Sequence, residues 1–424
     1  MNFYNKRIIE KTIKTKFEYS GGLLIKGPKA CGKTTTAKKF AKTILDLNDT
    51  SKRNFYIEQS LRNPNTLINV KEYPLLIDEW QIIPHIWDTL RAQIDNKQKE
   101  GLFLLTGSST PSDKNSIAHS GIGRINSINM RTMSLYEFGD SNGEISLLNL
   151  FDPNFEINNL IENNKTLDDL SFVICRGGWP QLLKWNSQNV QLNYVKDYYE
   201  SLIHNDAKYL NENIDFLTLD LIFKSYSRNV GSECSNNVLI EDIKNRGINK
   251  NTFSKYIRYL EDLYVIEELT SWNTKLRSKA VIRTSNTRYL IDPSLAAVSL
   301  NILPTKLKFD MNTFGLLFEN LCIRDLRIYA ESFGAKIYKY RDKNGLECDA
   351  IIVLEDGQWG LIEIKLSSSE QIIKKTKEKL NKLANLIDNE WWPKPAFKMI
   401  LTSGNFSYKT NDNFYIISIF NLKD

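Results

Sequence analysis

The chain has 424 residues and a formal net charge of +6, with 42% hydrophobic and 25% charged residues. At roughly 150 residues per domain this length indicates three or four domains, and the composition excludes wholesale disorder and a fibrous repeat. The mildly basic charge permits contact with nucleic acid but does not require it, because a lysine-rich solvated surface has the same charge.

No segment has the composition of a membrane span or a secretion signal. Residues Met1–Lys16 mix Lys, Glu and Ile without an apolar core, and apolar runs elsewhere fall far short of a span. We therefore expect a soluble, cytoplasmic protein with no membrane partner. The cysteines and histidines show no spacing typical of a disulfide framework or a zinc site; they are Cys31, Cys175, Cys234, Cys322, Cys348, His85, His119 and His204.

The first part of the chain alternates short apolar runs with helical segments. Such runs are apolar on both sides, which predicts a parallel sheet covered on both faces and hence an α/β domain. In chain order the expected elements are the strand Leu23–Ile25, the helix Thr34–Leu45, and the strands Phe55–Ile57, Leu75–Ile77 and Leu102–Leu105.

A phosphate-binding loop follows the first expected strand. Its sequence fits G-x-x-x-x-G-K-[ST] between a strand and a helix, the context in which that pattern binds nucleotide phosphates. Gly27 and Gly32 let the backbone wrap the phosphates, Lys33 reaches the β and γ phosphates, and the Thr34 hydroxyl ligates Mg²⁺. The predicted ligands are ATP and Mg²⁺, held by Gly27, Pro28, Lys29, Ala30, Cys31, Gly32, Lys33, Thr34 and Thr35.

Two adjacent carboxylates end the strand Leu75–Ile77, which is the form of a Walker B element. We expect Asp78 to belong to the Mg²⁺ shell and Glu79 to polarise the attacking water. The next strand ends in Thr-Gly-Ser-Ser, where the Ser108 hydroxyl could lie between the γ phosphate and that water. A plain turn is the alternative reading of these four residues.

Arg124 comes after this strand, on a segment that glycines make flexible. A cation there could act as an arginine finger on the γ phosphate in its own chain or in a neighbouring subunit of a homo-oligomer. The alternative is a surface arginine without a catalytic role.

The middle of the chain reads as a connector followed by a winged helix-turn-helix. Residues 140–171 are polar and predict loops with short helices, and 179–213 predict a helical lid. The winged-helix pattern is a helix at Leu239–Asn245, a turn, a helix at Asn251–Leu263, and strands at Val265–Trp272 and Ala280–Ile291. On its second helix Lys250, Lys255 and Arg258 could face DNA phosphates, although many winged helices only join domains.

The last part of the chain carries a second set of carboxylates. A helix at Phe314–Ser332 precedes strands at Lys336–Arg341, Cys348–Leu354 and Gly360–Lys365, and a lysine-rich helix and a strand at Met399–Thr402 follow. Asp349, Glu363 and Lys365 have the order D…E-x-K, with Glu363 and Lys365 on one strand face. Two carboxylates on Mg²⁺ and a lysine beside a water can hydrolyse a phosphodiester. Glu319 on the preceding helix is a candidate outer ligand.

These residues together resemble a large prokaryotic family of AAA-type ATPases with a C-terminal domain of unknown function 4143. In the first half the resemblance rests on Gly27–Thr34, Leu76–Glu79, Leu105–Ser109, Gly123–Arg124, Met133–Glu137 and Arg176–Pro180. In the second half it rests on Tyr289–Leu295, Leu317–Asn320, Tyr340–Asp342 and Ile362–Lys365. The resemblance implies an ATPase core, a winged helix and a terminal domain similar to restriction-endonuclease-like nucleases. Cys31 stands where the family usually has a small residue, and a cysteine is small enough to preserve ATP binding.

The resulting domain prediction is a P-loop ATPase core at 1–140, a helical connector at 141–213, a winged helix at 214–303 and a restriction-endonuclease-like α/β domain at 304–424. The function expected from it is an Mg²⁺-dependent ATPase whose nucleotide cycle controls the C-terminal region on DNA. The alternative is a nucleotide-dependent signalling or protein-binding switch with an inert C-terminal domain.

Overall fold

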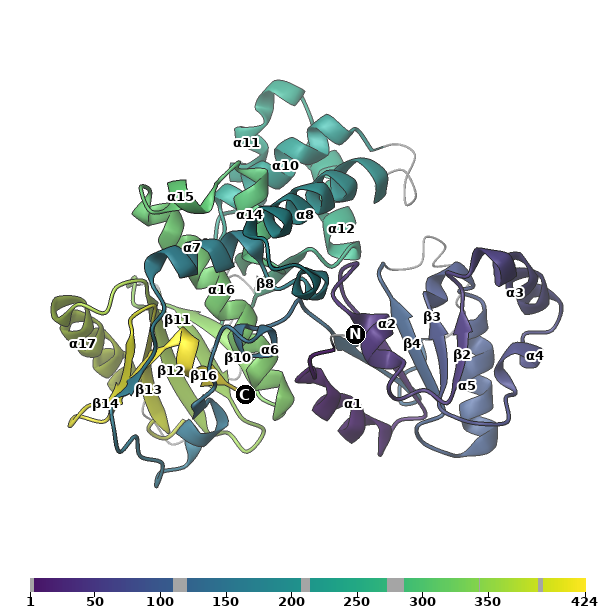
Figure 1. Cartoon of the computed structure of the whole chain (residues 1–424), viewed down its shortest axis with the longest axis horizontal. Helices are drawn as coiled ribbons and strands as arrows, with labels where there is room; N and C mark the ends of the chain where they lie inside the picture. Colours follow the sequence, from purple (N-terminus) through teal and green to yellow (C-terminus); the bar gives the residue numbers. More distant parts are fainter. Residues whose placement is uncertain (1–3, 110–119, 207–213, 273–285, 343, 388–391) are drawn as a thin grey trace. The chain divides into compact units, whose positions relative to one another are not determined.

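The computed structural model describes residues 4–109, 120–206, 214–272, 286–342, 344–387 and 392–424 (Figure 1). They divide into two compact units. The N-terminal unit consists of Ile9–Thr132 and Arg258–Val265, and the C-terminal unit consists of Met1–Ile8, Met133–Ile257 and Ile266–Asp424. Residues 207–213 of the predicted lid and 280–285 of the second predicted wing strand lie outside the described residues.

The N-terminal unit is built on a five-stranded parallel sheet in the order β2-β3-β4-β1-β5. The strands are β1 (Gly22–Lys26), β2 (Thr43–Asp46), β3 (Leu75–Asp78), β4 (Phe103–Gly107) and β5 (Ile125–Asn129). The helices are α1 (Ile9–Phe17), α2 (Lys33–Ala37), α3 (Thr50–Arg62), α4 (Asn65–Ile68), η1 (Trp80–Ile82) and α5 (Ile86–Lys97). This is the predicted α/β parallel-sheet core.

Side chains of the central strands alternate between two apolar clusters, one on each face of the sheet. Leu24 and Ile77 belong to the cluster that includes Leu90 of α5, whereas Leu23 and Leu76 belong to the cluster that includes Ile13 of α1. Because both faces are covered, β1, β3 and β4 carry consecutive apolar residues on both sides, as the sequence indicated.

Two predicted elements of this unit are wrong. The helix expected at Thr34–Leu45 ends at Ala37, and Thr43–Asp46 forms the edge strand β2 instead. The apolar run Phe55–Ile57, expected as a strand, lies inside the helix α3. Asp49 caps this helix by accepting a hydrogen bond from the Ser51 amide, so the capping residue overrides the strand preference of the aromatic run.

The C-terminal unit begins with helices and a two-stranded antiparallel sheet. These are α6 (Leu135–Phe138), α7 (Leu167–Arg176), α8 (Gln188–Ser201), α10 (Phe216–Arg228), α11 (Asn236–Asp242), α12 (Lys250–Asp262), β8 (Ile266–Leu269), β9 (Thr287–Leu290), α14 (Pro293–Ser299) and α15 (Pro304–Leu307). The last residues of α12, from Arg258 on, are counted with the N-terminal unit. The order α10-α11-α12-β8-β9 is the order expected for a winged helix, with strands shorter than predicted.

A seven-stranded mixed sheet completes this unit, in the order β10-β11-β12-β13-β15-β14-β7. Its elements are β7 (Ile161–Glu162), α16 (Met311–Ser332), β10 (Lys336–Arg341), β11 (Glu347–Val353), β12 (Trp359–Lys365), α17 (Glu370–Ile387), β13 (Phe397–Thr402), β14 (Phe406–Lys409) and β15 (Phe414–Ser418). Strand β6 (Ile145–Ser146) pairs with β16 (Leu422–Lys423). Because β6 and β7 pair with C-terminal strands, the predicted connector contributes to this part of the fold.

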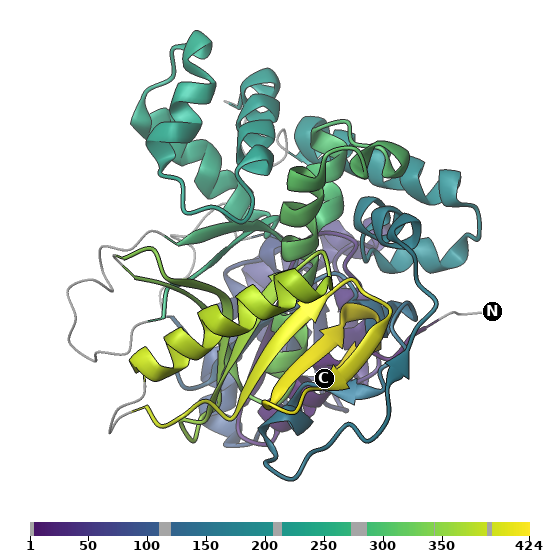
Figure 2. The ribbon, with the colours of Figure 1, turned by 90° about the vertical axis from the view of Figure 1, so that its left-hand side faces the viewer.

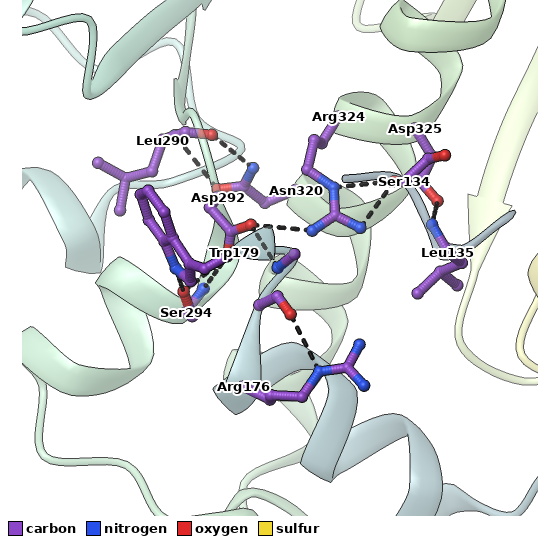
Figure 3. A network of polar contacts seen from close by, with 12 residues as sticks. Ser134, Leu135, Arg176, Trp179, Leu290, Asp292, Ser294, Asn320, Arg324 and Asp325 are labelled. Carbon is purple, nitrogen blue, oxygen red and sulfur yellow. Dashed lines mark hydrogen bonds and ion pairs between the residues drawn. The ribbon is translucent and has the colours of Figure 1, made fainter. Parts of the chain in front are cut away.

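A buried polar network joins distant segments of the C-terminal unit (Figure 3). The Arg324 guanidinium lies between Asp292, at 2.9 Å, and Asp325, at 2.8 Å, and all three side chains are buried. Asp292 also accepts a hydrogen bond from the amide of Gly178, and Asp325 accepts one from that of Leu135. The Asn320 side chain also bonds to the backbone of Leu290. Four of the segments that carried the family resemblance, 133–137, 176–180, 289–295 and 317–320, therefore meet in the core of this unit.

Candidate nucleotide site and second carboxylate site

The loop after β1 has the backbone geometry of a phosphate-binding loop. Gly27 has φ +155°, and a Cβ there would lie 2.1 Å from the carbonyl oxygen of Met130, so only glycine fits. Lys33 is buried, and its Nζ donates to the carbonyl oxygens of Gly27 at 2.9 Å and Pro28 at 2.8 Å. The ammonium group therefore already lies within the loop that would hold the phosphates.

Cys31 points away from the phosphate side of this loop. Its side chain is fully buried, and its Sγ lies 3.4 Å from the Met130 carbonyl oxygen, to which it donates. The substitution noted in the sequence is therefore accommodated in the core beneath the loop, with its backbone amide still part of the loop.

The structure places Asp78 beside Thr34, as a shared Mg²⁺ site requires. The Thr34 hydroxyl donates to Asp78 Oδ1 at 2.7 Å, and Thr106 donates to the same oxygen at 2.5 Å. The other oxygen, Oδ2, accepts from the Asn48 amide at 3.2 Å. A hydroxyl and a carboxylate are the hard oxygen ligands that Mg²⁺ prefers, so this pair of donors fits the ion.

Glu79 is fixed next to this pair by two side chains. It adopts the left-handed conformation, φ 59°, which few residues other than glycine occupy. Its Oε2 accepts from the Ser108 hydroxyl at 2.7 Å and from Gln81 Nε2 at 2.5 Å. The structure thus places Ser108 beside Glu79. The sequence analysis did not identify Gln81, on η1, because no sequence pattern marks an amide side chain at that position.

Arg124 lies at the amino ends of the parallel strands, whereas the phosphate loop lies at their carboxyl ends. It immediately precedes β5, which is in register with the start of β1 at Gly22, while the loop follows the end of β1. At about 3.3 Å per residue along β1, the two ends of the strand are on the order of 15 Å apart. Arg124 is half-exposed and its Nε pairs with Asp95 at 2.8 Å. The prediction that Arg124 acts on the nucleotide of its own chain is therefore wrong. Its action on the nucleotide of a neighbouring subunit stays a prediction.

The C-terminal carboxylates meet where β11 and β12 pair. The register Ala350↔Ile362 sets Asp349 opposite Glu363 on these antiparallel strands. Lys365 Nζ donates to Glu363 Oε1 at 2.7 Å and lies 3.8 Å from Asp349 Oδ2. The three residues predicted from the D…E-x-K order are therefore together.

Glu363 has an unused oxygen in this site. Its side chain is fully buried, Oε1 accepts from both Lys365 and Lys379, and Oε2 has no hydrogen-bond partner within the described part of the chain. Burial, followed by the nearby negative charge of Asp349, raises the pKa of Glu363. A buried carboxylate oxygen without a donor is costly unless a cation binds it, so the donor set fits a divalent metal. Lys379, on α17, was missed because it lies fourteen positions beyond Lys365 in a helix with several other lysines.

Glu319 is held by other groups. Its Oε1 accepts from the Tyr289 hydroxyl at 2.5 Å and from Lys339 at 3.3 Å. Burial, and then the charge of Asp349, raise the pKa of Glu319 to about 7. The described residues contain no group of three or more His, Cys, Asp or Glu side chains placed to hold one metal ion. The expectation of Glu319 as an outer ligand is therefore not supported by its position.

Comparison with known families finds a matching domain in each half of the chain. The AAA domain family matches residues 20–139, and the domain of unknown function DUF4143 matches residues 314–422. The chain belongs to the AAA-type ATPases that carry DUF4143. A further domain of unknown function, DUF8612, matches residues 167–306 of this AAA-type ATPase, and the boundary predicted between residues 213 and 214 falls inside it.

Individual relatives of the AAA-type ATPase are distant. The uncharacterized proteins Mb2031c of Mycobacterium bovis and Rv2008c of Mycobacterium tuberculosis are each 21% identical over 351 residues, covering 82% of this chain and 71% of theirs. The Walker-type ATPase PABY2304 of Pyrococcus abyssi aligns with a TM-score of 0.43 and 12% identity, over 70% of this chain and 96% of its own. A point variant of RuvB from Thermotoga maritima aligns with a TM-score of 0.29 and 17% identity, over 61% of this chain and 88% of its own. The roles of individual residues in this chain therefore rest on its own geometry.

Within the described residues, no helix combines the length and the apolar composition needed to cross a membrane.

Proposed function

We propose that this protein binds ATP with Mg²⁺ and hydrolyses it, with Asp78 in the metal shell and Glu79 as the base that orients the attacking water. The observation that carries the proposal is that Thr34, at the start of the helix after the β1 loop, bonds to Asp78 at the carboxyl end of β3, directly before Glu79. Bound Mg²⁺ would neutralise charge that develops on the phosphates.

The chain's own groups have separate tasks in this mechanism. Lys33 exchanges two loop carbonyl oxygens for phosphate oxygens when nucleotide binds, which keeps its ammonium group hydrogen-bonded throughout. Thr106 and Asn48 hold the Asp78 carboxylate in place. Ser108 and Gln81 hold Glu79 so that its carboxylate can accept a proton from water.

The test of nucleotide binding compares two lysine variants. Lys33→Ala should abolish ATP binding in isothermal titration calorimetry with Mg²⁺, because the buried ammonium group cannot be replaced. Lys42→Ala removes an exposed lysine just beyond the helix α2 and should bind as the wild type does. Wild-type affinity in Lys33→Ala would reject the assignment of the phosphate site.

We also propose that Asp349 and Glu363 bind a divalent metal and, with Lys365, hydrolyse a DNA phosphodiester under control of the nucleotide cycle. The support is specific: the unpartnered Oε2 of Glu363 lies in a site that also holds a second carboxylate and a lysine. Mg²⁺ and Mn²⁺ commonly bind through one or two carboxylates together with waters and substrate phosphates. The chain order α16-β10-β11-β12-α17-β13 gives the carboxylates two adjacent, rigid strands.

The cleavage assay should cover single-stranded, duplex and branched DNA without nucleotide, with ATP and with a non-hydrolysable analogue. Asp349→Ala and Lys365→Ala should each remove cutting and leave ATP hydrolysis intact. If no DNA is cut in any state and no metal binds, the C-terminal domain is an interaction module, and the protein is the nucleotide-dependent switch that forms the alternative.

DNA contact by the winged-helix region rests on three exposed cations. Lys250, Lys255 and Arg258 lie on the exposed side of α12, whereas Phe253 and Ile257 are buried. If they contact phosphates, the binding constant should fall with salt by about 0.9 log units per phosphate for each log unit of salt. A response to salt that is unchanged in Lys255→Gln would argue that this region only joins domains.

A further inference from the structure

The helix α17 presents two different flanks to the sheet beneath it. Figure 2 shows this helix lying across one face of the sheet. Its buried stripe packs there with Ile351, Leu361 and Ile400, and consists of Ile373, Leu380, Leu383, Ala384 and Ile387. Lysines lie on both sides of this stripe. The contacts of these lysines show which strands each side of the helix faces.

One flank faces the β13 and β15 side and is largely paired. Lys377 bonds to Asp412 at 2.7 Å, and Asn381 accepts a hydrogen bond from Lys398 on β13 at 2.7 Å. The other flank faces β12, because Lys379 reaches Glu363 Oε1 at 2.6 Å. The helix thus separates an ion-paired side from the side that borders the proposed metal site.

Two further lysines extend the flank of Lys379. Lys375 and Lys382 lie one turn before and one turn after it, at the i−4 and i+3 positions that share a helix face. Both side chains are exposed, and neither has an ion pair within the described part of the chain. Three cations therefore line one edge of α17, and the middle one touches a catalytic carboxylate of the proposed nuclease site.

The charges around Asp349 and Glu363 explain why lysines beside this site would attract a phosphate backbone. Asp349 and Glu363 are balanced by Lys365 and Lys379, so the four side chains sum to zero. A divalent cation bound to the carboxylates would leave an excess of two positive charges and would weaken the hold of Glu363 on both lysines. A phosphate backbone supplies the negative charge that such a site lacks.

We propose that Lys375, Lys379 and Lys382 form a track along α17 that binds the phosphate backbone of DNA and leads one strand to Asp349 and Glu363. The inference rests on the proposed phosphodiester hydrolysis at these carboxylates, and it adds the surface that holds the substrate. Lys379 connects the track to the carboxylates, because it bonds to Glu363 in this structure and would contact a phosphate once a metal binds Glu363.

The test measures DNA binding by the full chain with fluorescence anisotropy across a salt series, with Ca²⁺ present. Lys375→Gln/Lys382→Gln should lower the log-log salt slope by about 1.8 on duplex DNA, at about 0.9 for each phosphate contact. The matched control is Lys374→Gln/Lys394→Gln, which removes the same charge from two exposed lysines of the same domain. The control should leave the slope within error of the wild type.

Equal slopes in the two double variants and the wild type would overturn the track. A drop of equal size in both double variants would overturn it too, because the effect would then be one of net charge. Titration of Mn²⁺ separates this result from a failure of the nuclease proposal: metal binding that depends on Glu363 with an unchanged salt slope rejects the track alone, whereas absence of metal binding rejects the site itself.

Discussion

The two carboxylate sites of this protein differ in the charge of the groups that hold them. At the nucleotide site Asp78 and Glu79 accept hydrogen bonds from neutral hydroxyl and amide groups. At the C-terminal site Glu363 accepts from two lysines and also keeps one oxygen without a donor in the described part of the chain. Neutral donors orient a carboxylate and leave its charge available to a cation, whereas lysines neutralise it.

This difference indicates two modes of activation. The nucleotide site is already arranged for a metal that arrives with ATP, so its activity should depend on the orientation of Glu79. In the proposed function the C-terminal site exchanges lysine contacts for a metal, so its activity should depend on metal concentration and on the lysines that compete for Glu363.

The largest expected effect is on metal binding at the site proposed for the C-terminal unit. Glu363→Gln should weaken Mn²⁺ binding by at least about 100-fold, since loss of an outer-shell partner alone commonly costs roughly 10- to 100-fold. Calorimetry on the nucleotide-free protein measures it, with Glu355→Gln, an exposed glutamate of the same domain, as the control. Unchanged Mn²⁺ affinity would mean that the free oxygen of Glu363 does not bind metal.

A smaller effect is expected at the side chain that orients Glu79. Gln81→Ala should lower kcat for ATP about tenfold, equivalent to about 1.4 kcal/mol, while leaving ATP affinity unchanged, because Gln81 contacts Glu79 and Ser108 and not the phosphate loop. Gln93→Ala, on α5, is the control, since that side chain bonds to Asn65. A normal kcat would show that Ser108 suffices to place Glu79.

Arg124 tests whether the nucleotide site is complete within one chain. Its distance from the phosphate loop leaves only a neighbouring subunit for a finger role. Mixing inactive Lys33→Ala chains with inactive Arg124→Ala chains should therefore restore part of the ATPase rate. Mixed oligomers that form and stay inactive would leave Arg124 as the partner of Asp95.

The raised pKa of Glu319 predicts a pH dependence of stability. Burial and the charge of Asp349 raise this pKa to about 7 in the folded state, against partial compensation by Lys339 and Tyr289. As pH rises from about 4.5 to 7, the unfolded chain loses this proton while the folded chain retains it, so the unfolding free energy should fall. Glu319→Gln should show a shallower decline than the wild type in urea titrations at successive pH values. Parallel curves would contradict the assignment.

The sequence predicted the elements whose patterns are local. The phosphate loop has fixed spacing, and β10, which is rich in Tyr and Ile, has the predicted bounds Lys336–Arg341. The strand predicted at Phe55–Ile57 is wrong, because these residues lie inside the helix α3 that Asp49 caps. Strands as short as β6 and β7 carry no pattern of their own and exist only by pairing with residues near the other end of the chain.

The same limit applies to the candidate sites. Side chains that stand in a recognisable pattern were singled out from the sequence, and the structure brings Thr34 to Asp78 and Lys365 to Glu363. Gln81 and Lys379 were not singled out, because their role depends on where a turn and a helix place them. Of the Asp292, Arg324 and Asp325 network, only Asp292 lay in a segment that the sequence singled out, because the role of the other two depends on where the helix α16 places them.

The most direct test of the central claim follows ATP on the Glu79→Gln variant. Rapid filtration and single-turnover hydrolysis on one sample report binding and chemistry together. The variant should retain ATP with the wild-type affinity and hydrolyse it at least about 100-fold more slowly, because removal of a general base commonly costs that much. Hydrolysis at the wild-type rate would contradict the assignment of Glu79 and with it the mechanism proposed for the nucleotide site.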